Sequence, residues 1–290
     1  MRGTLLKGYS GFYYVFAEDR VWECSLRGRF RVKDQDFLPG DIVVIQPGLG
    51  EKATIEKVER RRNFLMRPSI ANVDQVLVVL ALTSPEPDLN LLDRLLIQAE
   101  IKNVRPIVIL TKRDIWKATE EEEKQWNCYR NMGYPLMMIS NKTKEGIGEV
   151  SKHIAGKTSV LAGPSGAGKS SLLNALSPGL KLKTSEVGGK LKRGRHTTRH
   201  TELMICAGGL IADTPGFSNL FMSAMHREEL AGCFRDFYQF LGKCRFNNCL
   251  HFREPDCSIR EAVRQGKIAE SRYRHYLIFL QEIIAAERRY

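Results

Sequence analysis

A glycine-rich stretch that ends in lysine and serine has the composition of a phosphate-binding loop. It follows the pattern G-x-x-x-x-G-K-[ST], with a further serine after it: Gly163, Pro164, Ser165, Gly166, Ala167, Gly168, Lys169, Ser170 and Ser171. Backbone N–H groups of such a loop point at phosphate oxygens. The Lys169 ammonium can then reach the β- and γ-phosphates, and the Ser170 hydroxyl can ligate Mg²⁺. The stretch therefore predicts a site for a nucleoside triphosphate and its magnesium ion.

A second motif, D-x-x-G, follows further along the chain as Asp213-Thr214-Pro215-Gly216. A phosphate switch needs a carboxylate near Mg²⁺ and a glycine whose N–H reaches the γ-phosphate, and Asp213 and Gly216 supply both. Between the two motifs lie Thr197 and Thr198, either of which can close over Mg²⁺ when the γ-phosphate is present. We favour Thr198, so the predicted magnesium ligands are Ser170, Thr198 and Asp213.

The pattern N/T-K-x-D, which selects the base in GTP-binding proteins, is met by Thr111, Lys112 and Asp114. The Asp114 carboxylate can accept hydrogen bonds from N1–H and N2–H₂ of guanine, and the Lys112 stem can cover the base plane. Adenine has no such donor pair and would leave the carboxylate unpaired. Ser140 and Asn141 end a later predicted strand, where a backbone N–H would meet guanine O6. The pattern favours guanine, although threonine stands where asparagine is commoner.

Each motif stands at the end of a predicted strand. Residues 68–222 contain strands predicted near 74–82, 105–110, 135–140, 158–162, 202–207 and 209–213. Asp88 begins one amphipathic helix between them, and Thr119 forms a capping box with Glu122 at the start of another. A parallel sheet collects its site at the carboxyl ends of its strands. We therefore predict an α/β domain over 68–222 whose motifs share one edge of a sheet.

The order of the motifs is unusual, because the base-selecting residues precede the phosphate-binding loop. In ordinary G domains the loop comes first. Cutting the chain at another connection and joining the old ends would preserve a site that is built at the ends of parallel strands. The sequence therefore predicts a circularly permuted GTPase.

Residues 1–67 are predicted to form a small β domain. Strand-like segments over 11–16, 20–24, 41–45 and 53–58 have the spacing of a closed barrel, and the pattern alone leaves an SH3-like barrel open. Basic residues follow these segments or lie between them: Arg27, Arg29, Arg31, Lys33, Arg60, Arg61 and Arg62. As a set beside aromatic residues, they favour contact with RNA over a merely solvated surface.

Residues 223–290 carry three cysteines and a histidine in one short stretch: Cys244, Cys249, His251 and Cys257. Three thiolates and one imidazole complete a tetrahedral zinc shell, which leaves no open position for catalysis. We predict one structural Zn²⁺; unmetallated thiols beside a surface histidine are the alternative. The chain from Ser258 to Tyr290 is predicted to be helical, with an apolar face that packs as a cap or meets a partner.

This permutation, with a barrel before the GTPase domain and a zinc region after it, resembles the RsgA family (YjeQ and YloQ), the small-subunit ribosome-dependent GTPases. The resemblance spans essentially the whole chain. It implies an OB-fold for the barrel, a structural zinc site, and activation by the 30S subunit. It also implies a hydrophobic residue after D-x-x-G, which here is Phe217.

Phe217 stands where many GTPases have the glutamine that orients the attacking water, so intrinsic hydrolysis should be slow. His196 is the nearest candidate to position the water, and contact with RNA phosphate is its alternative role. Basic residues crowd the same segment, from Lys181 to Arg199. We expect Mg²⁺ and the γ-phosphate to order this segment and present its charges to rRNA; a solvated basic loop is the alternative.

Lysine and arginine number 45 against 33 aspartate and glutamate, and the net charge is +12. This balance favours an acidic partner, nucleic acid above all. The longest apolar run, 76–82, is far too short to span a membrane, and the N-terminus has no signal-peptide core. Seven cysteines, an odd number, argue against a disulfide framework. We expect a cytoplasmic protein that is a monomer.

Together these features predict a GTP hydrolase that binds the immature 30S subunit through 16S rRNA and couples hydrolysis of GTP to GDP to its own release. The substrate and reaction come from the motifs, and the role in late assembly comes from the resemblance. One alternative is an ATP-dependent P-loop enzyme, which Asp114 disfavours. The other is an RNA-binding structural or assembly protein whose nucleotide site is degenerate or serves only as a binding switch. The complete phosphate and switch motifs disfavour a degenerate site.

Overall fold

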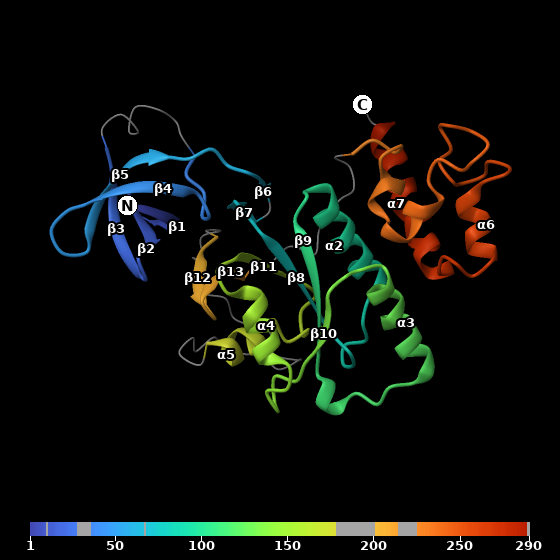
Figure 1. The fold of residues 1–290 in the computed structure, drawn as a ribbon, viewed down its shortest axis with the longest axis horizontal. Helices are drawn as coiled ribbons and strands as arrows, with labels where there is room; N and C mark the ends of the chain where they lie inside the picture. Colours follow the sequence, from blue (N-terminus) through green and yellow to red (C-terminus); the bar gives the residue numbers. More distant parts are fainter. Residues whose placement is uncertain (10, 28–35, 67, 178–200, 214–224, 289–290) are drawn as a thin grey trace. The chain divides into compact units, whose positions relative to one another are not determined.

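The structure, a computed structural model, describes the chain except residues 10, 28–35, 67, 178–200, 214–224 and 289–290 (Figure 1). The chain packs into two compact units. The first comprises Met1–Pro87, Ile107–Trp116 and Met137–Phe217, and the second comprises Asp88–Pro106, Lys117–Leu136 and Ser218–Tyr290. The second unit thus combines the C-terminal region with two segments of the predicted α/β domain. The division into domains at 1–67, 68–222 and 223–290 stays a prediction.

The first unit begins with a closed barrel in the strand order β1-β2-β3-β5-β4. Its strands are β1 (Arg2–Tyr9), β2 (Phe12–Ala17), β3 (Arg20–Leu26), β4 (Ile42–Pro47) and β5 (Lys52–Val58). β1 pairs with β4 and closes the barrel, and β3 runs parallel to β5. Apolar side chains such as Leu5, Trp22 and Ile55 fill the interior. The predicted β domain is confirmed, and its closure is OB-like.

Sequence patterning does not reveal β1. The pairing of β1 with β2 shifts register between Leu5 and Lys7, and the neighbours Leu5 and Leu6 are both buried. This irregularity breaks the alternation of inward and outward residues by which a half-buried strand is recognised. The barrel therefore has one strand more than the four that the sequence predicts.

The α/β part of the first unit is a sheet in the strand order β10-β9-β8-β11-β13-β12. The strands are β8 (Gln75–Ala81), β9 (Arg105–Thr111), β10 (Leu136–Met138), β11 (Thr158–Ala162), β12 (Leu203–Cys206) and β13 (Gly209–Asp213). β11 lies inside the sheet and runs parallel to β8 and β13, whereas β12 is antiparallel to β13. All positions of β8 and β11 are buried, which explains their nearly continuous apolar sequences. The six predicted strands are confirmed.

Two helices, α4 (Ile147–Ile154) and α5 (Lys169–Leu176), pack on this sheet. Val150 and Leu172 from these helices share one buried cluster with strand residues such as Leu77, Ile109 and Ile211. A short hairpin of β6 (Phe64–Met66) and β7 (Ser69–Ala71) precedes β8 in the chain, and the single turn η1 (Arg113–Ile115) follows β9. The cluster fixes α5, and with it the loop that enters α5, against the sheet.

The second unit is helical. Its elements are α2 (Leu89–Ile101), α3 (Glu120–Asn131), η2 (Leu230–Cys233), η3 (Arg235–Phe240), α6 (Ser258–Arg264) and α7 (Glu270–Glu287). Both predicted helix starts are confirmed: Asp88 accepts a hydrogen bond from the Leu91 N–H at 3.0 Å, and Thr119 forms a capping box with Glu122. The tail forms two helices instead of one, because Gly266 takes a left-handed φ of +69° after α6.

The apolar face predicted for the tail is buried within the second unit. Ile259, Ile268 and Leu280 join a core with Phe234 and Phe237, the aromatic residues that flank or lie in η3. Packing within the chain, rather than exposure to a partner, therefore covers this face.

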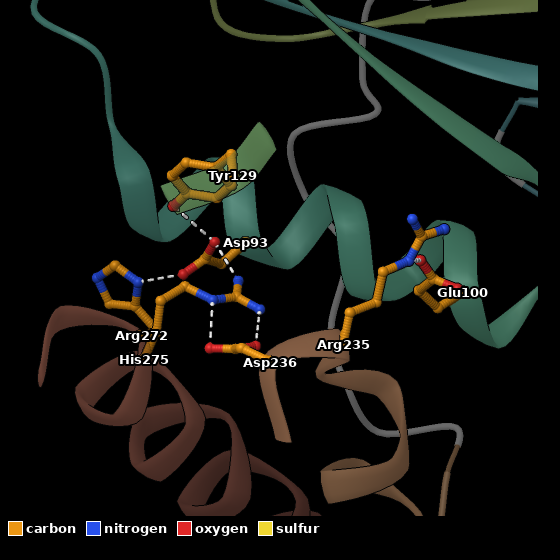
Figure 2. A network of polar contacts seen from close by, with 7 residues as sticks. All are labelled: Asp93, Glu100, Tyr129, Arg235, Asp236, Arg272 and His275. Atoms are coloured by element: carbon orange, nitrogen blue, oxygen red, sulfur yellow. Dashed lines mark hydrogen bonds and ion pairs between the residues drawn. The ribbon is translucent and has the colours of Figure 1, made fainter. Parts of the chain in front are cut away.

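A buried cation joins α7 to α2 and η3 (Figure 2). The Arg272 side chain on α7 is 2 % exposed and lies between the carboxylates of Asp93 on α2 and Asp236 on η3. Arg272 donates to Asp236 at 2.8 and 3.3 Å and also pairs with Asp93. Asp93 further accepts from the Tyr129 hydroxyl at 2.8 Å and lies 2.6 Å from His275 Nδ1. Because every buried charge has a partner, the network can persist in an apolar surrounding.

Two further ion pairs link the same elements. The Arg94 guanidinium on α2 donates twice to Glu282 on α7, at 2.6 Å each, and lies over the Phe279 ring. Arg235 donates to Glu100 at 2.7 Å. The sequence motifs predict no role for any of these charged residues.

All seven cysteines lie in the described part of the chain, and none of them forms a disulfide bond. Cys24 and Cys206 are buried, as expected of core cysteines, whereas Cys128 and Cys233 are only half-buried. No helix in the described part of the chain is long and apolar enough to cross a membrane.

Candidate nucleotide and metal sites

The predicted phosphate and base motifs meet at one edge of the sheet. Asp213, the last residue of β13, pairs with Leu161 of β11 in parallel register, directly before the phosphate loop. β8 is also parallel to β11, and at the end of β9 the Thr111 carbonyl accepts from the Leu82 N–H at 3.0 Å. The ends of β8, β9, β11 and β13 therefore lie side by side, as expected for a site built on parallel strands.

The loop between β11 and α5 requires glycine near both ends. Gly163 has a φ of +137°, and a Cβ on it would lie 2.0 Å from the Val79 carbonyl oxygen. Gly168 has a φ of +90° and directly precedes Lys169, the first residue of α5. The Lys169 ammonium lies 2.8 Å from the carbonyl oxygens of Gly163 and Pro164, so it reaches back over the loop. A helix that begins after such a loop directs N–H groups and a positive dipole end at a phosphate.

The predicted base-selecting carboxylate, Asp114, lies in η1. The Ser140 hydroxyl donates to Asp114 Oδ1 at 2.6 Å, and this hydrogen bond lowers the pKa of the Asp114 carboxyl. The carboxylate is therefore ionised at neutral pH and held in one orientation. The Lys112 ammonium donates to the Ser84 carbonyl in the loop after β8. The sequence predicts only a backbone contact near Ser140, because a contact between two strand ends leaves no local signal in the sequence.

Two further side chains connect the base-selecting residues with the phosphate loop. The Thr111 hydroxyl donates to the Ala167 carbonyl at 2.7 Å, and the Asn141 amide donates to the Gly168 carbonyl at 3.2 Å. The sequence predicts that Thr111 and Asn141 lie near the base, but it does not predict their contacts with the loop. The folded chain thus ties the two halves of the candidate site together.

Several predicted residues lie outside the described part of the chain. They are His196, Thr197, Thr198, Gly216, Phe217, the basic residues between 181 and 199, and Arg29, Arg31 and Lys33 in the barrel region. Of Asp213 only the backbone is described. The roles assigned to these residues stay predictions.

The four predicted metal ligands converge in the second unit. Their ligand atoms all lie within 4.8 Å of one another: Cys244, Cys249, His251 and Cys257. His251 Nδ1 is 3.5 Å from the Cys244 sulfur and 3.4 Å from the Cys257 sulfur, and these two sulfurs are 3.9 Å apart. A tetrahedron around zinc, with bonds of about 2.3 Å to sulfur and about 2.0 Å to nitrogen, has edges of about 3.5–3.8 Å. The cluster has the size and the donor atoms of a zinc site.

Other side chains hold the ligand loop in shape. The Glu254 carboxylate accepts from three backbone N–H groups, those of Leu250, Phe252 and Arg253, at 2.8–3.0 Å. The Tyr273 and Tyr276 hydroxyls on α7 donate to the His251 and Leu250 carbonyls, both at 2.7 Å: these two contacts fix the loop to α7. Burial lowers the pKa of His251, which keeps its imidazole neutral and able to bind a metal.

Three of the basic residues predicted for RNA contact have carboxylate partners in the first unit. Arg27 pairs with Glu56, Arg62 pairs with Asp74 at 2.9 Å, and Arg61 donates to the buried Asp41 at 2.6 and 2.9 Å. Because Asp41 is fully buried, Arg61 stabilises the fold by pairing with its carboxylate. Contact of this set with RNA stays a prediction.

Comparison with known proteins gives matches over both the barrel and the α/β sheet. The family model of the RsgA GTPase matches residues 58–223, and that of the RsgA N-terminal domain matches residues 2–55. The small ribosomal subunit biogenesis GTPase RsgA of Moorella thermoacetica is 50% identical over 290 residues, 99% of each chain. The protein of that name from Geobacillus kaustophilus is 44% identical over the same share of both chains.

Two crystal structures resemble the whole chain. YloQ, described as a circularly permuted GTPase, superposes with a TM-score of 0.82 at 37% identity and covers 98% of this chain and 95% of its own. YjeQ from Thermotoga maritima superposes with a TM-score of 0.83 at 36% identity, with 98% of each chain covered.

A sheet whose phosphate loop follows its base-selecting residues in the chain has the order of a circularly permuted GTPase. The predicted permutation is confirmed, and the activity of this class is the hydrolysis of GTP. The chain belongs to the RsgA GTPase family.

Proposed function

We propose that GTP binds and is hydrolysed at the sheet edge where β8, β9, β11 and β13 end. One observation carries this assignment: the base-selecting residues and the phosphate loop are joined by hydrogen bonds. Thr111, three residues before Asp114, donates to Ala167 inside the loop at 2.7 Å. A single nucleotide can therefore place its base at Asp114 and its phosphates at Lys169 at the same time.

In this assignment, the loop from Gly163 to Ser171 holds the phosphates, and Lys169 offsets the charge of the β- and γ-phosphates. Ser170, Thr198 and Asp213 would hold Mg²⁺, which neutralises charge that develops on the phosphate oxygens. The register of β13 supports this choice, because it places Asp213 beside Leu161 at the entrance to the loop. Gly216 would donate its N–H to the γ-phosphate.

Guanine is recognised by the ionised Asp114, which accepts from N1–H and N2–H₂. Ser140 supports this role by fixing Asp114 Oδ1 at 2.6 Å. Lys112 covers the base, and the backbone N–H at Asn141 meets O6. His196 positions water or contacts RNA phosphate, and Phe217 leaves the isolated enzyme slow.

The metal cluster is proposed to bind one structural Zn²⁺ per chain through Cys244, Cys249, His251 and Cys257. The distances of 3.4–3.9 Å among the ligand atoms of Cys244, His251 and Cys257 support this choice. With Cys249 included, all four ligand atoms lie within 4.8 Å of one another. Metal analysis of freshly purified protein should return one zinc per chain, and clearly less zinc would contradict the assignment.

The partner is proposed to be the small ribosomal subunit, the 30S particle, through its 16S rRNA. The relatives are named small ribosomal subunit biogenesis GTPases, and the net charge of +12 suits an RNA partner. In this role the protein acts in the cytoplasm as a monomer, binds with GTP late in assembly, and leaves after hydrolysis.

The test is GTP turnover with and without purified 30S subunits, with free 50S subunits as the matched control. We expect strong stimulation by 30S alone, and its loss in Lys169→Ala. GTP-dependent 30S binding without stimulated turnover would favour the alternative, an assembly protein that uses nucleotide only as a binding switch. Equal affinity for ATP and GTP would contradict the guanine site itself.

A further inference from the structure

We propose that Asn141 reads the N7 atom of guanine and ties the base-binding turn to the phosphate loop. The proposal deepens the guanine site proposed above and rests on it. It starts from Thr111, the position where N/T-K-x-D proteins more commonly have asparagine. An asparagine amide has two N–H donors, whereas a threonine hydroxyl has one.

The single donor of Thr111 is already used. Its hydroxyl donates to the Ala167 carbonyl at 2.7 Å, and the side chain is fully buried. Thr111 can therefore hold the phosphate loop, but it has no hydrogen left for a base acceptor.

Asn141 carries the second donor hydrogen that Thr111 lacks. Its Nδ2 donates one hydrogen to the Gly168 carbonyl at 3.2 Å, which leaves the second hydrogen for another acceptor. Its Oδ1 is buried and has no hydrogen-bond partner among the described residues, so the contact with Gly168 sets the orientation of the amide. The reversed amide would place Oδ1 against the Gly168 carbonyl oxygen, an unfavourable pairing of two acceptors.

Thr111 and Asn141 approach the same point of the loop. A Cβ placed on Gly168 would lie 3.2 Å from Asn141 Nδ2 and 3.3 Å from Thr111 Oγ1. The two side chains therefore flank Gly168 together, and Gly168 leads directly into Lys169. A displacement of Asn141 would therefore also displace the loop residues that are proposed to hold the phosphates.

The neighbours of Asn141 indicate which base atom it meets. Ser140, directly before it, fixes Asp114 by a hydrogen bond. Asp114 is the residue assigned above to the N1 and N2 donors of guanine. Guanine presents its two acceptors, O6 and N7, next to one another on the adjoining edge. The backbone N–H of Asn141 is assigned to O6. Because N7 lies next to O6, the side-chain N–H of the same residue is then the donor for N7.

The test compares GDP with 7-deaza-GDP, in which a C–H replaces N7 and the donors that face Asp114 are kept. Competition with a fluorescent guanine nucleotide gives both dissociation constants. For the unmodified protein we expect 7-deaza-GDP to bind about three- to tenfold more weakly, the effect of one neutral hydrogen bond. Asn141→Ala should weaken GDP by a similar factor and bind the two nucleotides equally.

Thr143→Ala is the matched control, because Thr143 lies two residues away with an exposed side chain. This variant should retain the full preference for GDP over 7-deaza-GDP. Equal binding of the two nucleotides by the unmodified protein, or an undiminished preference in Asn141→Ala, would overturn the proposal. Either result leaves the guanine site intact, whereas loss of the preference for GDP over ADP would mean that the guanine site itself had failed.

Discussion

At the scale of single residues, the candidate site depends on side chains that orient other side chains. Asp114 is the carboxylate proposed for guanine, and the Ser140 hydroxyl fixes its direction at 2.6 Å and favours its ionised form. Thr111 and Asn141 likewise act on the loop carbonyls of Ala167 and Gly168. Base selection and phosphate binding are therefore parts of one hydrogen-bonded arrangement, and a substitution in one part should be measurable in the other.

The base preference can be reversed at Asp114. Asp114→Asn should weaken GTP binding by roughly 1.5–3 kcal/mol, because a charged acceptor of two hydrogen bonds is lost. The new amide can donate to the C2 carbonyl of xanthine, so the variant should prefer XTP. Competitive nucleotide binding measures both effects. Ser140→Ala is the control: it should weaken GTP without favouring XTP. An Asp114→Asn variant that still prefers GTP to XTP would show that another group selects the base.

At the scale of elements, α2 is the surface on which the C-terminal region packs inside the second unit. On α2, Asp93 contacts Arg272 and His275, and Glu100 pairs with Arg235 (Figure 2). Arg94 on the same helix pairs with Glu282. The same helix α7 holds the ligand loop through two tyrosine hydroxyls. One face of α7 therefore contacts the loop of the four predicted metal ligands, and another face contacts α2. The position of α7 sets the distance between that loop and α2.

The buried charges make the position of α7 sensitive to Arg272. Arg272→Ala leaves Asp93 and Asp236 buried without their cation, which should destabilise the second unit by about 3–5 kcal/mol. Hydrogen exchange of the amides in α2 and α7 measures this, because a chain of two units need not unfold in one step.

Two further variants test whether the loss of stability comes from the unpaired buried charges. The combination Arg272→Met, Asp93→Asn and Asp236→Asn removes all three charges and should recover more than half of the loss, since no unpaired ion remains. Arg274→Ala, on the exposed side of α7, should change the stability by less than about 0.5 kcal/mol. A loss below about 1 kcal/mol for Arg272→Ala would mean that apolar packing alone holds α7 in place.

At the scale of the whole molecule, the two compact units of the structure do not coincide with the three consecutive domains predicted from the sequence. The sequence places α2 and α3 within the α/β domain, yet both pack with the C-terminal region, while the strands around them belong mainly to the first unit. Short connections enter these helices: α2 begins shortly after Ser84, the partner of Lys112, and α3 begins shortly after Asp114. The base-selecting turns thus stand where the chain passes from one unit to the other.

Coupling between nucleotide and 30S binding is expected from the basic segment between the two phosphate motifs. GTP should strengthen 30S binding and GDP should weaken it. Neutralising Lys190, Lys192 and Arg193 together should lower 30S affinity with a GTP analogue, flatten its salt dependence, and barely change the GDP-bound affinity. Binding measured at several salt concentrations tests this. Equal losses in both nucleotide states would show that these charges bind RNA without reporting the nucleotide.

The motifs of the candidate site and most of the elements that carry them were predictable from the amino-acid sequence alone. The phosphate loop, the D-x-x-G and T-K-x-D motifs and the four metal ligands are local patterns, and their order revealed the permutation. Both helix starts, at Asp88 and Thr119, were predictable because capping depends on residues three apart. The strands of the sheet were predictable because buried parallel strands are continuous apolar runs.

Which distant side chains meet could be learned only from the folded chain. The contacts of Ser140 with Asp114, Thr111 with Ala167 and Asn141 with Gly168 depend on the register between neighbouring strands, which no local pattern records. The Arg272 network depends on how α7 packs on α2, and β1 is hidden by its own shift in register. Local propensity and spacing act within a few residues of the chain, whereas these contacts join segments that come together only when the core is packed.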